Sequence, residues 1–479
     1  MLRNIRFSTF FKNFFYVSFG NITSQILNFA IMVYVANVFG PGQFGIISFV
    51  NIVVMYFFYL ASFGLYGLGV IEASKNRKSL KKTVDTIVSL RIVLAIIVFI
   101  LLCIVTLFIQ EDKNFKIMLL INGLTILGSS FYIDWVFNGI EEMKYSSISV
   151  IIKNVVYCIL IGALIGSGIS RSIYIVPISL VIATFASSGY LFWAYIKRQK
   201  QRFSFRFNIR EYKALLGESW PFFFNGIFAL VNLNMDTLML GVLKTNYEVG
   251  LYNSVYRIAS ALILVISFFF TPVYPMLISN FNEGKHETLT LIINKLRKLM
   301  ITICIPIFLG AFILNKEIMS TLYKDDYLIA ANTFTILMVY IAILSIREIY
   351  GYELNAWGQQ KKYMKAVSVS AVYNIIGNAL LIPHFGIEGA AINTLISEII
   401  NYMLMKKYAN EVLKIQYENR YILKILISGM CLAATVYLMK LITANALYII
   451  SVAGTVYFAA IFLTKAFTLN ELKELLLRK

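Results

Sequence analysis

Polar side chains recur at helical spacing inside segments of this sequence that are otherwise apolar. Asn21, Gln25 and Asn28 lie four and three residues apart, which places them on one face of a helix. Asn225 and Asn232 repeat the pattern later in the chain. Amides are costly against lipid, so such a face should line a wet cavity, or else make interhelical hydrogen bonds. The predicted cavity lining comprises Asn21, Gln25, Asn28, Asn225, Asn232 and Asn253.

Four cations also lie inside apolar segments. Arg257 is about nine residues into its segment, or roughly 13 Å at helical rise, which is close to a bilayer midplane. Arg91 could instead reach the headgroups from near a segment end, and Arg347 could simply pair with its neighbour Glu348. The guanidinium fork matches phosphate oxygens, so buried arginines indicate an anionic substrate. The predicted substrate-binding cations are Arg257, Arg347, Lys153 and Arg91.

Carboxylates in the same segments suggest a second kind of site. A buried acid could bind sodium or a proton and couple its movement to transport, and Asp236 is the acid that continues the stripe of Asn225 and Asn232. Pairing with a nearby arginine is the alternative. No cofactor and no metal centre are predicted beyond possible Na⁺ or H⁺ coupling. The coupling-ion candidates are Asp236, Glu348, Asp134 and Glu398.

The elements that position these side chains are membrane helices. The 479 residues are 59% hydrophobic and 14% charged, with a mean hydropathy of +0.75, whereas a soluble domain is about a quarter charged. The apolar residues come in blocks of roughly twenty, enough to cross about 30 Å of hydrocarbon. We therefore predict an all-α polytopic membrane protein. About fourteen spans are expected, near residues 14–37, 43–67, 86–109, 114–138, 146–167, 172–196, 215–241, 249–271, 299–315, 328–354, 363–383, 387–405, 422–440 and 444–464.

The net charge of +19 follows the same topology. Most of the 43 lysines and arginines fall in alternate loops, such as EASKNRKSLKK and KRQKQRFSFRFNIREYK, and few fall in the loops between them. Because cytoplasmic loops carry the excess of Lys and Arg, both termini are predicted to be cytoplasmic. Membrane topology thus explains the charge, and no nucleic-acid partner is expected.

Several kinds of chemistry have no motif in this sequence. The four cysteines lie within apolar blocks, so neither a disulfide framework nor a zinc site is indicated. There is no GxxxxGK phosphate loop and no nucleophile elbow, and His286 and His384 have no ligand-spaced partners. The short KDDY loop, with Asp325 and Asp326, is the only acidic candidate for a glycosyltransferase or polymerase. The protein is therefore not expected to be an enzyme.

An internal repeat organises the chain. The stretch DWVFNGIEEMKYSSIS at 134–149 is matched by NAWGQQKKYMKAVS at 355–368, with Asn138 aligned to Asn355. The amide stripe of the first span recurs in the seventh at a constant offset. A six-span unit is even, so both copies enter the membrane in the same direction, as in transporters with two rocking lobes. The predicted domains are an N-lobe at 1–200, a C-lobe at 201–410, and two added helices with a tail at 411–479.

The segment SWPFFFNGIFALVNLNMDTLMLGVLKTNYEVGLYNSVYRIASALILVISFFFTPVYPML, together with NGIEEMKYSSIS, resembles a known family. It is similar to the Wzx-like polysaccharide-unit flippases of the multidrug/oligosaccharidyl-lipid/polysaccharide superfamily, and the likeness extends over nearly the whole chain. The pattern from Asp236 to Ile258 is its most specific part. The resemblance implies a cavity between two six-helix lobes, with two helices appended.

The resemblance also implies a function. The substrate would be an undecaprenyl-diphosphate-linked oligosaccharide, moved by alternating access from the inner to the outer leaflet of a bacterial cytoplasmic membrane. Membrane lipid, a polysaccharide polymerase and assembly proteins would be partners. Arg257, helped by Arg347 and Lys153, would compensate the diphosphate, and the amides would bind sugar hydroxyls. A lipid II-type precursor flippase, a cation-coupled drug antiporter and a non-transporting scaffold remain alternatives.

Overall fold

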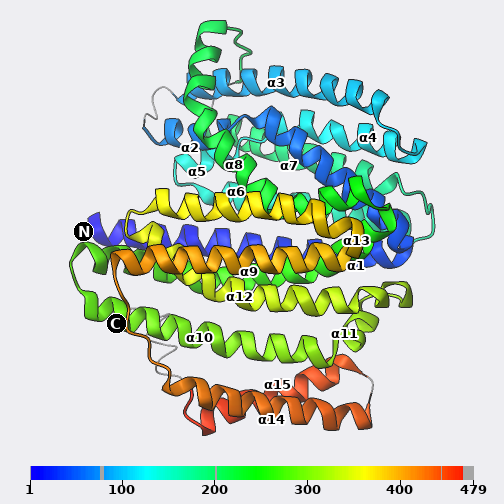
Figure 1. Ribbon diagram of the computed structural model, residues 1–479. Helices are drawn as coiled ribbons and strands as arrows, with labels where there is room; N and C mark the ends of the chain where they lie inside the picture. Colours follow the sequence, from blue (N-terminus) through cyan, green and yellow to red (C-terminus); the bar gives the residue numbers. More distant parts are fainter. Residues whose placement is uncertain (1, 76–79, 200–201, 444, 468–479) are drawn as a thin grey trace. The chain divides into compact units, whose positions relative to one another are not determined.

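The chain folds almost entirely into long α-helices, as a computed structural model shows (Figure 1). The structure describes residues 2–75, 80–199, 202–443 and 445–467, and no strand occurs within these ranges. The helices of the first half are α1 (Leu2–Ser62), α2 (Leu65–Lys75), α3 (Leu80–Phe108), α4 (Lys113–Ser130), α5 (Asp134–Gly139), α6 (Met143–Ile161), α7 (Ile175–Gln199) and α8 (Ile209–Leu243). Those of the second half are α9 (Asn246–Asn282), α10 (His286–Ile313), α11 (Asn315–Leu322), α12 (Ala331–Ala356), α13 (Gln360–Val412), α14 (Arg420–Ile442) and α15 (Ala446–Leu463).

Twelve described helical segments are long and apolar enough to cross a membrane. Two of them are interrupted by a glycine with a positive φ: α1 turns at Gly40, where φ is 72°, and α13 turns at Gly386, where φ is 54°. Glycine takes this conformation without the steric cost that a Cβ brings. Each of these two helices therefore holds two apolar segments, so the twelve contain the fourteen that the sequence predicts. The prediction of an all-α polytopic membrane protein is confirmed.

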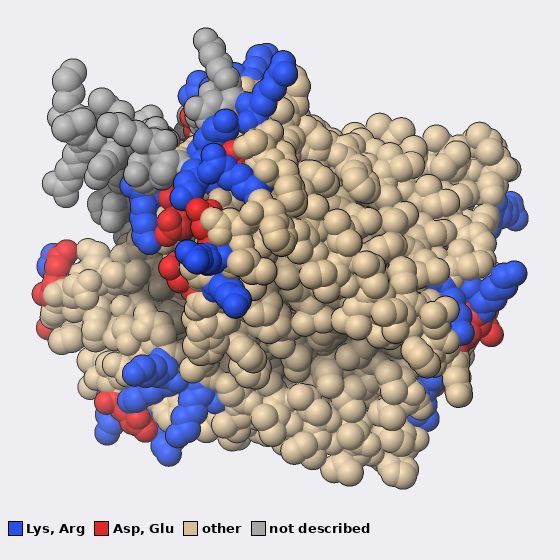
Figure 2. Space-filling model, turned by 90° about the horizontal axis from the view of Figure 1, so that it is seen from above, with Lys and Arg blue, Asp and Glu red and all other residues tan. Residues whose placement is uncertain are grey.

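Charged side chains are confined to the ends of the helices on the face that Figure 2 shows. A broad band of uncharged residues separates the two ends, and most of the lysines and arginines on this face lie at one of them. Such a band is what a bilayer requires, because an ionised side chain at its centre costs roughly 3 kcal/mol or more.

The described chain divides into two compact units, Met1–Asn234 and Met235–Lys479. The division falls inside α8, so the first part of this helix packs with the N-terminal helices. The three domains expected from the sequence stay a prediction.

The core of the first unit lies where α2, α5, α3 and α7 meet. Trp135 of α5 is wholly buried there, and Gly69 of α2 faces its ring. A Cβ on Gly69 would come within 2.6 Å of the indole, and one on Gly139 within 2.6 Å of the Ala73 side chain. These two glycines are therefore needed for α2 and α5 to approach so closely.

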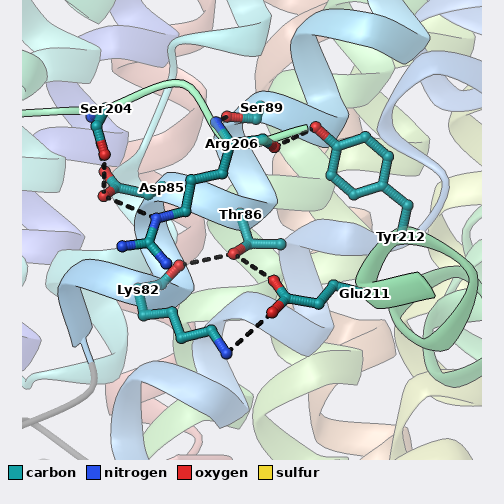
Figure 3. Close-up of polar contacts among 8 residues, drawn as sticks. All are labelled: Lys82, Asp85, Thr86, Ser89, Ser204, Arg206, Glu211 and Tyr212. Atoms are coloured by element: carbon teal, nitrogen blue, oxygen red, sulfur yellow. Dashed lines mark hydrogen bonds and ion pairs between the residues drawn. The ribbon is translucent and has the colours of Figure 1, made fainter. Parts of the chain in front are cut away.

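A polar clamp fastens the segment 202–208, which connects α7 to α8, onto the first turns of α3 (Figure 3). The buried Asp85 carboxylate accepts hydrogen bonds from the Ser204 amide at 3.1 Å and the Ser204 hydroxyl at 2.9 Å. It also lies 3.7 Å from the Arg206 guanidinium, whose amide donates to Ser89 Oγ at 2.9 Å. An extended segment without helical hydrogen bonds thus finds its partners on α3.

The start of α8 is attached to the same turns of α3 (Figure 3). Glu211 pairs with Lys82 at 2.9 Å and accepts a hydrogen bond from Thr86 at 3.2 Å. Tyr212 donates its hydroxyl hydrogen to the Arg206 carbonyl at 2.7 Å. The clamp therefore fixes where α8 enters the membrane, and α8 carries Asp236 further along.

In the second unit, the two halves of α13 pack against each other and against α12. Ser370 donates to the Ser397 carbonyl at 2.8 Å, and Asn393 donates to the Asn374 carbonyl at 2.7 Å. Helices α14 and α15 lie side by side next to α10 (Figure 1). Tyr457 of α15 donates to the Thr302 carbonyl of α10 at 2.8 Å. The last two helices are thus built into this unit.

Candidate functional site

A buried carboxylate in the second unit, Asp236 of α8, is surrounded by neutral hydrogen-bond donors. Its Oδ1 atom accepts from the Asn374 amide at 3.2 Å and from the Asn378 amide at 2.6 Å. Its Oδ2 atom accepts from the Tyr252 hydroxyl of α9 at 2.9 Å and from the Thr394 hydroxyl of α13. Three helices therefore converge on a single acid.

Helical spacing and a close helix contact build this cluster. Asn374 and Asn378 are one turn apart on the first half of α13, and Asn378 also donates to the Asn374 side chain at 3.0 Å. Thr394 comes from the second half, which the turn at Gly386 brings back alongside the first. Gly377 lets the halves meet, because a Cβ there would lie 1.9 Å from Asn393 Oδ1.

The electrostatics of the cluster favour a small cation. No lysine or arginine forms an ion pair with Asp236 within the part of the chain that the structure describes, and the four side chains that donate to it are neutral. The Oδ1 atom of Asn378 is buried and has no hydrogen-bond partner there. Carboxylate, amide, hydroxyl and carbonyl oxygens are the ligands of hard cations. A turn of the Asn378 amide would add its oxygen to those of Asp236 and Thr394.

Arg347, in contrast, has its charge compensated. It is buried in α12 and bonds to Glu398 of α13 at 2.5 Å and to Glu348 at 2.9 Å. The ion pair considered as the alternative for this residue is therefore present, and both acids are occupied by it. Substrate binding by Arg347, and ion coupling by Glu348 or Glu398, stay predictions that this geometry does not favour.

Arg91 of α3 is also engaged within its own unit. It is buried and donates to the carbonyl of Ser129 in the last turn of α4 at 2.7 Å and to the carbonyl of Tyr132, just after that helix, at 2.8 Å. These contacts hold the break between α4 and α5. Asp134 starts α5, and its Oδ1 atom is buried with no partner among the described residues. Their predicted roles in substrate and ion binding are not tested by this arrangement.

Lys153 differs from the paired cations. Lys153 is half-buried in α6 of the first unit and makes no ion pair or hydrogen bond with any described residue. An uncompensated cation in a membrane helix is costly and therefore points to an anionic ligand. Arg257 is half-buried in α9 of the second unit, near the hydroxyl of Tyr323.

The amide side chains predicted to line a cavity differ in how far they are exposed. Asn21 and Asn225 are exposed, whereas Gln25, Asn28 and Asn232 are half-buried. Asn253 is buried and donates to the Val249 carbonyl at 2.9 Å and to Thr237 of α8 at 3.4 Å. For Asn253 the structure thus shows the interhelical hydrogen bond that was the alternative. A lining role for the others stays a prediction.

Sequence reasoning found Asp236 but missed its partners. Asn374 and Asn378 follow the same four-residue rule that identified the stripe of the first span, so that rule applied to the eleventh span would have found them. Tyr252 and Thr394 carry no such signal, since single hydroxyls are common in apolar helices. Only the packing of α9 and α13 against α8 gives them a role.

The fold places the chain among polytopic all-α membrane proteins. The lipid II flippase MurJ in its inward closed conformation superposes with a TM-score of 0.76, covering 96% of this chain and 99% of that one at 16% identity. At this identity the likeness establishes the fold alone.

Residues 10–281 match the family described as polysaccharide biosynthesis protein, and the chain belongs to that family. A probable low-salt glycan biosynthesis flippase, Agl15 of Haloferax volcanii, is 26% identical over 44% of this chain, and the match spans 45% of its own length. A putative O-antigen transporter of Shigella dysenteriae is 21% identical over 80% of this chain and 96% of its own. These similarities support the predicted Wzx-like, polysaccharide-flippase resemblance.

Proposed function

We propose that the protein is a flippase that moves a lipid-linked oligosaccharide across the membrane by alternating access, coupled to a monovalent cation bound at Asp236. The observation that supports ion coupling is a buried carboxylate with four neutral donors and no cationic side chain paired with it among the described residues. Family membership and the names of the related proteins supply the class of substrate. No catalytic step is part of this proposal.

The residues at Asp236 fit a cation such as Na⁺. One negative charge neutralises one monovalent ion, and the oxygens of Asn374, Asn378 and Thr394 would complete its coordination. The carbonyl of Ala390, which accepts from Thr394 at 3.0 Å, is a further oxygen of the same helix. Because these groups belong to different helices, ion binding would stabilise the arrangement of α8 against α13 over arrangements that separate them.

The substrate end of the proposal rests on one cation, Lys153, which has no ion pair among the described residues. A headgroup with a diphosphate carries at least as much charge as one ionised side chain, and that alone costs roughly 3 kcal/mol or more at the bilayer centre. Lys153 would compensate this charge, since no acid neutralises it in the structure. A role for Arg257 in phosphate binding stays a prediction from the sequence. The polyprenyl tail would stay in lipid.

The cation site is tested with purified protein in proteoliposomes. Asp236→Asn should abolish the dependence of flipping on Na⁺ and the Na⁺-dependent rise in melting temperature. Asp325→Asn is the matched control, because that acid is exposed at a helix end. Unchanged ion dependence in the Asp236 variant would remove this site from the mechanism.

The substrate is tested with three cargoes in the same vesicles: a labelled polyprenyl-diphosphate oligosaccharide, a lipid II analogue and a cationic dye. We expect transport of the oligosaccharide lipid and at least a tenfold loss in Lys153→Ala, about 1.4 kcal/mol. Transport of lipid II alone would support the peptidoglycan-precursor alternative. Transport of dye alone would support an antiporter, and transport of none would support a scaffold.

A further inference from the structure

A second buried acid in the same unit, Glu353, lies near the C-terminal end of α12. Glu353 is 1% exposed, and its Oε1 atom is buried and has no hydrogen-bond partner in the described chain. Another buried polar atom nearby, the Trp357 indole nitrogen, also has none. Glu353 and Trp357 are one helical turn apart. This end of α12 thus holds a group of unsatisfied polar atoms.

The connector 413–419, which leads from α13 to α14, covers this end of the unit. Asn294 of α10 donates to the Gln416 carbonyl at 2.8 Å and accepts from the Glu418 amide at 3.1 Å. The ring of Tyr417 lies edge-on to Tyr350 of α12, with 6.4 Å between the centroids. Burial, followed by the nearby Glu353 carboxyl, raises the pKa of the Tyr417 hydroxyl. The connector therefore packs against α10 and α12 close to the Glu353 carboxyl.

The cations near this acid are directed elsewhere. The Arg297 guanidinium of α10 lies over the Tyr417 ring at 4.5 Å and donates to the Asn419 side chain at 3.1 Å. Lys406 of α13 lies over the ring of Tyr402 at 5.6 Å. From α9, the group facing this end is uncharged, since Phe281 stacks on Trp357. None of these groups forms an ion pair with Glu353 in the part of the chain that the structure describes.

Ionisation of Glu353 would therefore be unsupported. A carboxylate removed from water is stabilised by a cation or by several donors, and this one has neither. A proton removes the charge at the least cost. We propose that Glu353 is a proton-binding site, which takes its proton from the aqueous side that the connector 413–419 faces and returns it there when the connector moves.

The chemistry of the step is a simple exchange. A Glu353 carboxylate oxygen takes one proton from hydronium and becomes a neutral carboxylic acid, leaving water, and the reverse step releases the proton. The ligand differs from that of Asp236, because Asp236 has four donors that stabilise its charge. The coupling of this proton to transport rests on the proposed function, whereas proton binding itself does not.

Infrared spectroscopy of the full chain in lipid vesicles tests proton binding without any transport assay. At about pH 7, well above the ordinary glutamate pKa of about 4.3, we expect a carboxylic-acid carbonyl band that Glu353→Gln removes. Glu411→Gln is the matched control, because Glu411 is exposed and paired with Lys362 at 2.9 Å, so its loss should leave the band unchanged. A band that survives in Glu353→Gln, or is absent from the wild type, would overturn the proposal.

A second measurement needs no variant. Carbodiimides attack protonated carboxyls in apolar surroundings, so a hydrophobic carbodiimide should modify Glu353 of the wild-type protein at about pH 7, as read by mass spectrometry, and modification should fall as the pH is raised. Labelling of exposed acids such as Glu411 without Glu353 would contradict the proposal. A transport assay then decides coupling: Glu353→Gln should lose the pH dependence of flipping while keeping the Na⁺ dependence. If Glu353→Gln instead lost only the Na⁺ dependence, the proposed coupling of this proton to transport would be wrong.

Discussion

The clamp on α3 predicts that Asp85→Asn will loosen the segment 202–208. The isosteric change leaves one acceptor oxygen but removes the charge that the Ser204 amide and hydroxyl share. A hydrogen bond to a charged group contributes about 1.5 to 3 kcal/mol. The ion pair with Arg206 adds little, because it is 3.7 Å long and the arginine side chain is 44% exposed. We therefore expect the free energy of local opening to fall by about 2 kcal/mol.

Amide hydrogen exchange followed by mass spectrometry measures this opening directly. Since 1.4 kcal/mol is a factor of ten, peptides covering 202–208 should exchange roughly 30-fold faster in the variant. Ser89→Ala removes the acceptor of the Arg206 amide and should accelerate exchange at that residue. Asp112→Asn is the control, because that acid is exposed and makes no capping hydrogen bond. Equal exchange in Asp85→Asn and the wild type would refute the reasoning.

Two further substitutions test the second unit. Gly377→Ala should displace Asn393, because a Cβ at residue 377 would lie 1.9 Å from the Asn393 Oδ1 atom. The variant should therefore bind Na⁺ about tenfold more weakly in a thermal-shift titration. Gly454→Ala is the control and should leave Na⁺ binding unchanged, because a Cβ at residue 454 would meet open space. Arg347→Ala should lower stability by about 3 to 5 kcal/mol, seen as a lower melting temperature, because it leaves the buried Glu398 without its partner. Unchanged Na⁺ affinity in the first variant, or an unchanged melting temperature in the second, would contradict these expectations.

The helices could be predicted from the sequence because their signal is local. An apolar block of about twenty residues needs no knowledge of its neighbours to be recognised as a span. Even the two sharpest turns were marked, since Gly40 and Gly386 separate the predicted spans that share α1 and α13. The assignment of all-α membrane architecture therefore required only composition and block length.

The site could be predicted only in part, because pairing between helices is not local. Arg347 and Glu398 are 51 positions apart, and nothing in either segment specifies that they meet. Asp236 was recognised from its spacing to Asn232, yet its structural partners come from α13 and α9. Lys153 had a weaker sequence argument than Arg257 or Arg347, yet it makes no ion pair or hydrogen bond with any described residue. The partners that the fold brings to each charged side chain, rather than its residue type, therefore distinguish a structural ion pair from a candidate binding group.

The buried acids of the second unit show why partner choice matters. Asp236, Glu398 and Glu353 are each at most 7% exposed, so all three face the same cost of desolvation. Neutral donors surround the first, Asp236, which is the acid that we propose binds a cation. Arginine neutralises the second, which ties α12 to α13. The third has no support for a charge at all, so its ligand is a proton. The same residue type in one apolar environment would thus serve as an ion site, a structural ion pair or a proton site, depending on which groups the neighbouring helices place beside it.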